Sequence, residues 1–90
     1  MMFVKITPVF TDQQRRFSLE IDEESGRTFV SFPVANRLID YLEYYEIDRA
    51  TFDGYVADPT TAHAFVAAAK ARQMDHLLLY KPGRDRGVPS

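Results

Sequence analysis

Two segments near the start of the chain alternate apolar and polar residues with the period of two that is typical of β-strands. The first covers residues 3–10. Pro8 within it cannot donate to a neighbouring strand, so this strand lies at a sheet edge or is interrupted there. The second, residues 17–22, alternates without a break. Its alternation predicts that one face of this strand meets a core and the other meets water.

A polar turn and a third apolar segment follow. Residues 23–26 end in Gly26, which can adopt the positive φ that a tight turn requires. Residues 28–32 are rich in β-branched and aromatic side chains and stop before Pro33. Two strands joined by a short loop that contains glycine predict a β-hairpin.

Residues 37–47 fit either type of secondary structure. A helix would gather their apolar side chains in one stripe, whereas a strand would use the high β-propensity of their three tyrosines. A helix here would also run into the next helix with neither Gly nor Pro between them. A strand that ends near Ile47 leaves Asp48 as the N-cap of the following helix. We therefore predict a strand.

Two helices are predicted between this strand and residue 73. Residues 49–57 carry apolar side chains at helical spacing, although the Asp-Gly pair at 53–54 is also a hairpin signal. Alternation on both sides of that pair is absent, which favours the helix. The helix over 58–73 has a firmer start, because Asp58 can cap it and Pro59 suits its first turn. Six alanines within it strengthen this prediction.

The last apolar segment, residues 76–80, is an uninterrupted run of the kind found in interior strands covered on both faces. Residues 83–90 are poor in apolar side chains, which predicts a flexible C-terminal tail. Residues 1–82 would then form a single α+β domain. We expect a mainly antiparallel sheet of about five strands, in the order β-β-β-β-α-α-β, with two helices packed on one face.

Composition limits the classes of protein to which this chain can belong. It has 90 residues, no cysteine and an apolar fraction of 46%. The length suits one domain, and the lack of cysteine excludes disulfide scaffolds, thiolate nucleophiles and cysteine-ligated metals. No apolar run approaches the ~20 residues of a membrane span, and residues 1–8 lack the features of a secretion signal. We therefore expect a soluble, cytoplasmic protein.

The net charge of −2 conceals an uneven distribution. Residues 20–58 contain ten acidic side chains and three arginines, whereas the rest of the chain contains three acidic and eight basic ones. The two sets can interleave on the folded surface. Alternatively, the basic set can form a patch for phosphates or for the acidic part of a second copy. The pI of about 5.6 disfavours a dedicated nucleic-acid binder.

The chain carries no motif for a metal, a cofactor or a catalytic nucleophile. His63 has no partner at the i+4 position, which excludes the helical zinc motif. The glycines match no phosphate-binding loop, and no serine stands in a nucleophile motif. We therefore expect neither metal nor cofactor. Glu43 and His76 remain candidate proton acceptors for an enzyme or a ligand-binding site.

Tyrosines gather in the middle of the chain, where four of the five lie within fifteen residues. In a strand, Tyr41 and Tyr45 share one face and Tyr44 takes the other. If the helices cover one face of the sheet, the other exposes a row of aromatic rings with parts of the first and third strands, including Phe29. Exposed patches of this kind indicate a partner or a ligand groove.

These patterns predict a small non-enzymatic interaction module that self-associates through the uncovered sheet face. The candidate contact residues are Tyr41, Tyr45 and Phe29, with Arg15 and Arg16 at the rim. We expect a homodimer and no membrane partner, with another protein or a small apolar ligand as alternative occupants of that face. The alternative function is a small enzyme or ligand-binding protein that uses a tyrosine-lined pocket with Glu43 or His76.

Overall fold

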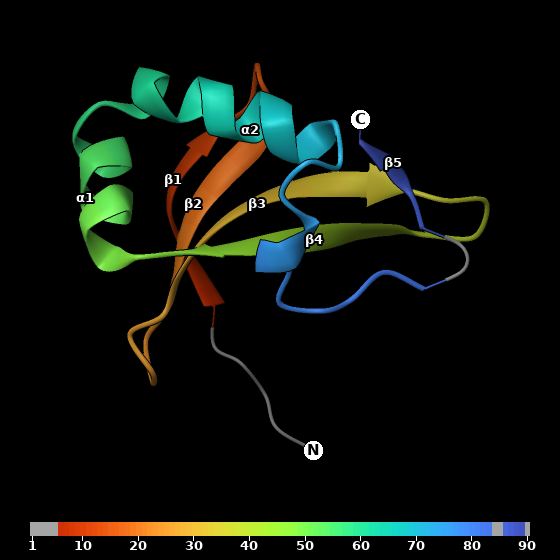
Figure 1. Cartoon of the computed structure of the whole chain (residues 1–90), viewed down its shortest axis with the longest axis horizontal. Helices are drawn as coiled ribbons and strands as arrows, with labels where there is room; N and C mark the ends of the chain where they lie inside the picture. Colours follow the sequence, from red (N-terminus) through yellow and green to blue (C-terminus); the bar gives the residue numbers. More distant parts are fainter. Residues whose placement is uncertain (1–5, 84–85, 90) are drawn as a thin grey trace.

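The computed structural model describes residues 6–83 and 86–89 and contains an antiparallel β-sheet with two α-helices on one of its faces (Figure 1). The elements are β1 (Ile6–Asp12), β2 (Phe17–Asp22), β3 (Thr28–Ala35), β4 (Asp40–Ile47), α1 (Arg49–Ala57), α2 (His63–Lys70) and β5 (Val88–Pro89). The spatial order is β1-β2-β3-β4, and β5 pairs with β3. This arrangement confirms the predicted α+β class, the order of the elements and the placement of both helices on one face.

The core lies between the sheet and the helices. Strand alternation sends every second side chain of β2, β3 and β4 toward the helices, so the period-two pattern builds one apolar face. The buried residues of the core are Phe17, Leu19, Val30, Phe32, Val34 and Tyr45 from the sheet, and Phe52, Ala62, Val66 and Ala69 from the helical layer. Burial of these side chains holds the helices on the sheet.

β3 continues through Pro33, where we predicted its end. Pro33 pairs with Leu42 of β4, and β2 pairs with β3 only as far as Ser31. The backbone groups of successive residues in an antiparallel strand point alternately to one neighbouring strand and to the other. At position 33 an N–H would point away from β4, to the side where β2 has already ended. Its loss removes no bond of the ladder, and the strand runs on to Ala35.

The helices begin at the capping residues that the sequence indicates. Asp48 accepts a hydrogen bond from a backbone N–H of the first turn of α1 at 2.7 Å, and Asp58 accepts one in the same way at 3.2 Å. The second helix is shorter than the predicted 58–73. Residues 59–62 form a 3₁₀ turn, and α2 follows and ends at Lys70.

Residues 76–80 do not form the interior strand that we predicted. The chain makes a 3₁₀ turn over Asp75–Leu77 and then a single antiparallel bridge from Leu78 to Tyr45, at the outer edge of β4. Leu77 and Leu78 pack against the core, so burial explains the apolar run without a strand. A short apolar run does not by itself distinguish these two structures.

The C-terminal segment lies against the sheet, although we expected residues 83–90 to form a flexible tail. β5 pairs with the end of β3 (Figure 1). The backbone N–H of Gly87 donates to the hydroxyl oxygen of Tyr41 at 2.7 Å. Residues 86–89 are therefore part of the folded layer, and they supply the fifth strand.

Replacing Gly87 with Ala tests this packing. The backbone of Ala35 lies only 2.8 Å from the position that a Cβ atom on Gly87 would occupy. A contact this short forces the two chain segments apart. We expect Gly87→Ala to lower the free energy of unfolding by about 1–3 kcal/mol, as measured by urea denaturation.

Gly54→Ala is the matched control. Gly54 lies inside α1, and apart from its chain neighbours and the backbone of the helix itself no atom lies within 4 Å of the position that a Cβ atom would occupy. Alanine favours a helix over glycine, so this variant should raise the free energy of unfolding by about 0.5–1 kcal/mol. Equal stability of Gly87→Ala and the wild type would contradict the close approach of the C-terminal segment to β3.

Candidate functional site

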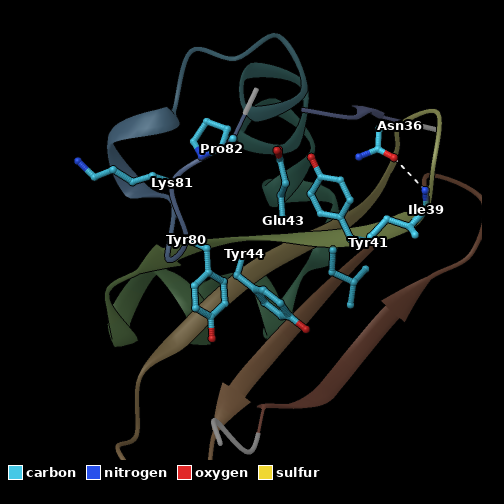
Figure 2. A pocket seen from close by; sticks show the side chains of 10 residues that line it. Asn36, Ile39, Tyr41, Glu43, Tyr44, Tyr80, Lys81 and Pro82 are labelled. Atoms are coloured by element: carbon cyan, nitrogen blue, oxygen red, sulfur yellow. Dashed lines mark hydrogen bonds between the residues drawn. The ribbon is translucent and has the colours of Figure 1, made fainter. Parts of the chain in front are cut away.

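A groove of about 330 Å³ lies between the outer edge of β4 and the chain at residues 80–83 (Figure 2). Its lining includes Ile39, Tyr41, Leu42, Glu43 and Tyr44 on the β4 side and Tyr80 on the opposite wall. The two walls lie far apart in the sequence. The groove therefore exists only because the 3₁₀ turn and the bridge at Leu78 bring the later segment to β4.

Part of the β4 backbone that faces this groove pairs with none of the described residues. The carbonyl oxygen of Tyr44 accepts a hydrogen bond from the N–H of Leu79 at 2.9 Å, so the polar backbone groups of Tyr44 point away from β3. Those groups alternate in direction along a strand, and the N–H and C=O of Leu42 therefore point the same way. No described residue pairs with the Leu42 backbone on that side. Leu42 thus offers one donor and one acceptor to the groove.

Two tyrosine rings line the groove on the sheet face that is turned away from the helices. In Figure 2, Tyr44 and Tyr80 point to one side of β4, and Glu43 and Tyr41 point to the other. The Tyr44 ring packs edge-on against Phe29, with centroids 6.0 Å apart, and burial raises the pKa of Tyr44. Tyr80 is 60% exposed. The groove therefore combines a ring held by packing with one that is open to a ligand.

A buried network of ion pairs borders the groove on the helix-facing side. Arg86 donates to the carboxylate of Glu43 through Nε at 2.9 Å and Nη2 at 3.2 Å. It also donates to Asp75 through Nη1 at 2.8 Å and Nη2 at 2.9 Å. The side chains of Glu43 and Arg86 are only 6% and 11% exposed, whereas that of Asp75 is 40% exposed. Arg86 thus joins β4, the 3₁₀ turn and the C-terminal segment.

The contacts around Arg86 shift the pKa values of Arg86 itself, Asp75 and Tyr45. Hydrogen bonds from Arg86 lower the pKa of Asp75, and its bonds to Asp75 and then Glu43 raise the pKa of Arg86. Burial, followed by the hydrogen bond to Glu43, raises the pKa of Tyr45 well above its ordinary value. The Tyr45 hydroxyl therefore keeps its proton and donates a hydrogen bond to Glu43 at 2.7 Å. Both carboxylate oxygens of Glu43 thus accept hydrogen bonds from side chains of the protein.

The aromatic face that we predicted is not accessible, because Tyr45 and Phe29 are fully buried. Tyr45 lies on the helix-facing side and stacks on Phe32, with ring centroids 5.2 Å apart. Phe29 lies on the opposite face against Tyr44, with the guanidinium of Arg27 over its ring. Strand alternation sends the side chains of β4 positions 41 and 45 to the core and that of β3 position 29 to the other face, so these rings form no common row.

The other predicted residues are divided among three places. Tyr41 and Glu43 line the groove beside β4. Arg15 and Arg16 lie between β1 and β2 and line a different groove next to α2. His76 is exposed in the 3₁₀ turn and does not line the groove beside β4. Of the two candidate proton acceptors, Glu43 therefore lies in the groove beside β4 and His76 lies outside its lining.

Sequence reasoning misses Leu42, Tyr80 and Arg86. Tyr80 ends the run that we assigned to an interior strand, and Arg86 belongs to the expected tail. The direction of the Leu42 backbone groups depends on the register in which β4 pairs with β3. The alternation of residues within β4 does not give that register by itself. No local pattern signals the pairing of Arg86 with Glu43, because 43 residues separate them.

Residues 6–83 and 86–89 contain no group of three or more histidine or carboxylate side chains that could hold a metal ion. No helix in the same ranges has the length and apolar character needed to cross a membrane.

No protein family, curated protein or solved structure matches the chain significantly.

Removing the Arg86 side chain tests the ion-pair network. Arg86→Leu leaves the buried Glu43 carboxylate without its cation, and we expect it to lower the free energy of unfolding by about 3–5 kcal/mol. Asp75→Asn removes only the more exposed pair, and Arg86 keeps Glu43 as its partner. This second variant should cost less than about 1 kcal/mol. Urea denaturation measures both, and equal losses in the two variants would contradict the assignment of Glu43 as the buried partner.

Proposed function

We propose that this protein is a small non-enzymatic binding module whose groove beside β4 holds a short extended segment of another polypeptide. The observation that carries this proposal is the outward-pointing N–H and C=O of Leu42, placed inside a groove with aromatic and aliphatic walls. An extended peptide satisfies such an edge by adding a strand to the sheet, which is a recurring mode of peptide recognition. Main-chain hydrogen bonds supply affinity there, and side-chain pockets supply selectivity.

The length of the open edge limits the size of the bound segment. Leu79 already occupies the edge of β4 at Tyr44, so the open part extends from Asp40 to Glu43. At ~3.3 Å per residue this edge is about 13 Å long and pairs with about four residues. The segment is therefore a short linear stretch or a chain end, held between β4 and residues 80–83.

The two faces of the groove select different side chains. On one face of an added strand, alternate side chains meet Leu42, Tyr44 and Tyr80, which favours apolar or aromatic residues there. On the other face they meet the Tyr41 hydroxyl and the Glu43 carboxylate, which Gly87 and Arg86 already engage. Selectivity therefore comes from the Tyr44 side, at every second residue of the bound segment.

A second copy of this chain fits the edge poorly. Two-fold pairing of β4 strands centred on Leu42 would place Asp40 of one copy opposite Tyr44 of the other, where Leu79 already lies. A pairing shifted to avoid Leu79 brings the two Asp40 carboxylates closer together, which is unfavourable. These points favour a segment of another protein over the homodimer that the sequence led us to expect.

The enzyme alternative gains no support from the groove. Glu43 lines it, but Arg86 and Tyr45 occupy both carboxylate oxygens. His76 lies outside the lining. Binding of an extended peptide uses the Leu42 N–H and C=O and the apolar walls of the groove, whereas proton transfer would use none of them.

Leu42→Pro tests the proposal with a library of displayed random peptides as the probe. The substitution removes the outward N–H, but β4 keeps its ladder with β3 because that N–H does not point to β3. We expect wild-type protein to enrich peptides with apolar residues at alternate positions. Leu42→Pro should bind an enriched peptide at least about tenfold more weakly, as measured by isothermal titration calorimetry.

Two controls separate the backbone contribution from other effects. Leu42→Ala loses the same side chain and keeps the N–H, so it should retain most of the affinity. Tyr80→Ala changes an exposed ring and should weaken binding while leaving the melting temperature unchanged. Enrichment of no peptide by the wild type, or equal affinity of Leu42→Pro and Leu42→Ala, would contradict the proposal. A wild-type dimer that Leu42→Pro converts to monomer would make a second copy the occupant instead.

A further inference from the structure

A second groove, of about 510 Å³, runs along α2 on the helix-facing side of the molecule. We call it the α2 groove. One wall is the connection between β1 and β2, residues 14–16, and the other is one stripe of α2. The stripe consists of His63, Val66, Ala67 and Lys70, at the i, i+3, i+4 and i+7 positions. At ~1.5 Å per residue it is about 10 Å long.

Basic side chains gather along the α2 groove: Arg15, Arg16 and Lys70 line it together with His63. The carboxylate of Asp12 lies beside them, and its Oδ1 accepts backbone hydrogen bonds from residues 14 and 15, both at 2.9 Å. Its Oδ2 lies 4.0 Å from Nε2 of His63. The described residues give neither Arg15 nor Lys70 an ion-pair partner.

The ammonium of Lys70 lies over the ring of Phe32, 5.6 Å from the ring centroid. This half-buried ammonium donates to the carbonyl oxygen of Arg15 at 3.0 Å. An ammonium has three donors, and the described residues offer Lys70 no carboxylate within ion-pair distance. Burial, followed by the charge of Arg16, lowers the pKa of Lys70. An anion between Lys70 and the arginines would offset this repulsion.

The groove is held in shape before any ligand binds. Asp12 fixes the turn by capping two consecutive backbone N–H groups, so the backbone that carries Arg15 and Arg16 has a defined position. The imidazole of His63 packs edge-on against the Phe17 ring, with centroids 6.0 Å apart. Preformed donors on fixed backbone lose little entropy when a ligand binds.

We infer that the α2 groove binds a small molecule that carries two or more phosphate groups. Lysine and arginine are the side chains that hold phosphate oxygens, and several of them here face one groove. The length of the groove suits a chain of linked phosphates better than a single one. Val66 and Ala67 supply an apolar strip between the polar ends, against which a nonionic part of the molecule can pack.

A small ligand fits this site better than a nucleic-acid strand. The chain as a whole carries a net charge of −2, and residues 20–58 hold ten of the acidic side chains. A long polyanion would meet this repulsion beyond the groove, whereas a compact one would not. The positive charge is local, and so is the proposed ligand.

Isothermal titration calorimetry with inorganic pyrophosphate, at low ionic strength, tests the inference. We expect saturable one-site binding that weakens as salt is added, because charged groups carry the affinity. Lys70→Gln and Arg15→Gln should each weaken binding by about tenfold, since each removes charged hydrogen bonds to phosphate. Arg37→Gln is the matched control, because Arg37 lies in the connection between β3 and β4 and does not line the groove. It should bind as the wild type does.

The melting temperature of each variant confirms that the fold is intact. Lack of saturable pyrophosphate binding, or equal binding by Lys70→Gln and Arg37→Gln, would overturn the inference. A single-stranded oligonucleotide forms a second arm of the experiment. Tight oligonucleotide binding that depends on Lys70, without binding of pyrophosphate, would also overturn it, because the occupant would then be a polymer. Failure of this site would leave the peptide groove beside β4 untouched.

Discussion

The ion pair between Arg86 and Glu43 is the interaction on which the arrangement of the sheet and its later segments depends. A carboxylate on the inward face of a strand is unfavourable unless a cation and hydrogen bonds compensate it. Arg86 provides both, from a segment 43 residues away in sequence. The charge on β4 therefore requires that the C-terminal segment cross the end of the sheet that the helices leave uncovered. Gly87 then passes close to β3, and β5 can form.

The same guanidinium links the fold to the candidate site. By binding Asp75 as well as Glu43, Arg86 holds the 3₁₀ turn beside β4, from which the chain continues to Leu79 and Tyr80. One wall of the groove is thus β4 itself, and the other is the segment that follows the turn. Leu79 covers the edge of β4 at one point and leaves it open at Leu42. The open part of the β4 edge begins where the chain leaves β4 after the hydrogen bond between Leu79 and Tyr44.

The sequence predicts the elements that local patterns encode. Alternation indicates β2, and the need for an N-cap at Asp48 correctly decides between helix and strand for β4. The α+β class and the placement of the helices follow from that order. The apolar run at residues 76–80 is misassigned, because leucines that reach the core from a 3₁₀ turn have the same composition as a buried strand.

The features missed in the site all depend on contacts between distant residues. Arg86 lies in a segment poor in apolar side chains. That segment is held on the sheet by the ion pair of Arg86 with Glu43, which exists only in the folded protein. The sequence predicts Tyr41, Tyr45 and Phe29 as contact residues of an exposed sheet face, but Tyr45 and Phe29 are fully buried, and the face that each ring occupies depends on the register between β3 and β4. Register also decides which backbone groups face the groove. Side-chain pattern therefore predicts the layers of this fold better than its surfaces.

Native-state hydrogen exchange of the Gly87 amide tests the central claim most directly. This N–H donates to Tyr41 only while Arg86 holds the C-terminal segment on the sheet. We expect strong protection of the Gly87 amide in the wild type and loss of that protection in Arg86→Leu, while the amide of Leu19 in β2 stays protected in both. A Gly87 amide that exchanges at the rate of an unfolded chain in the wild type would contradict the account.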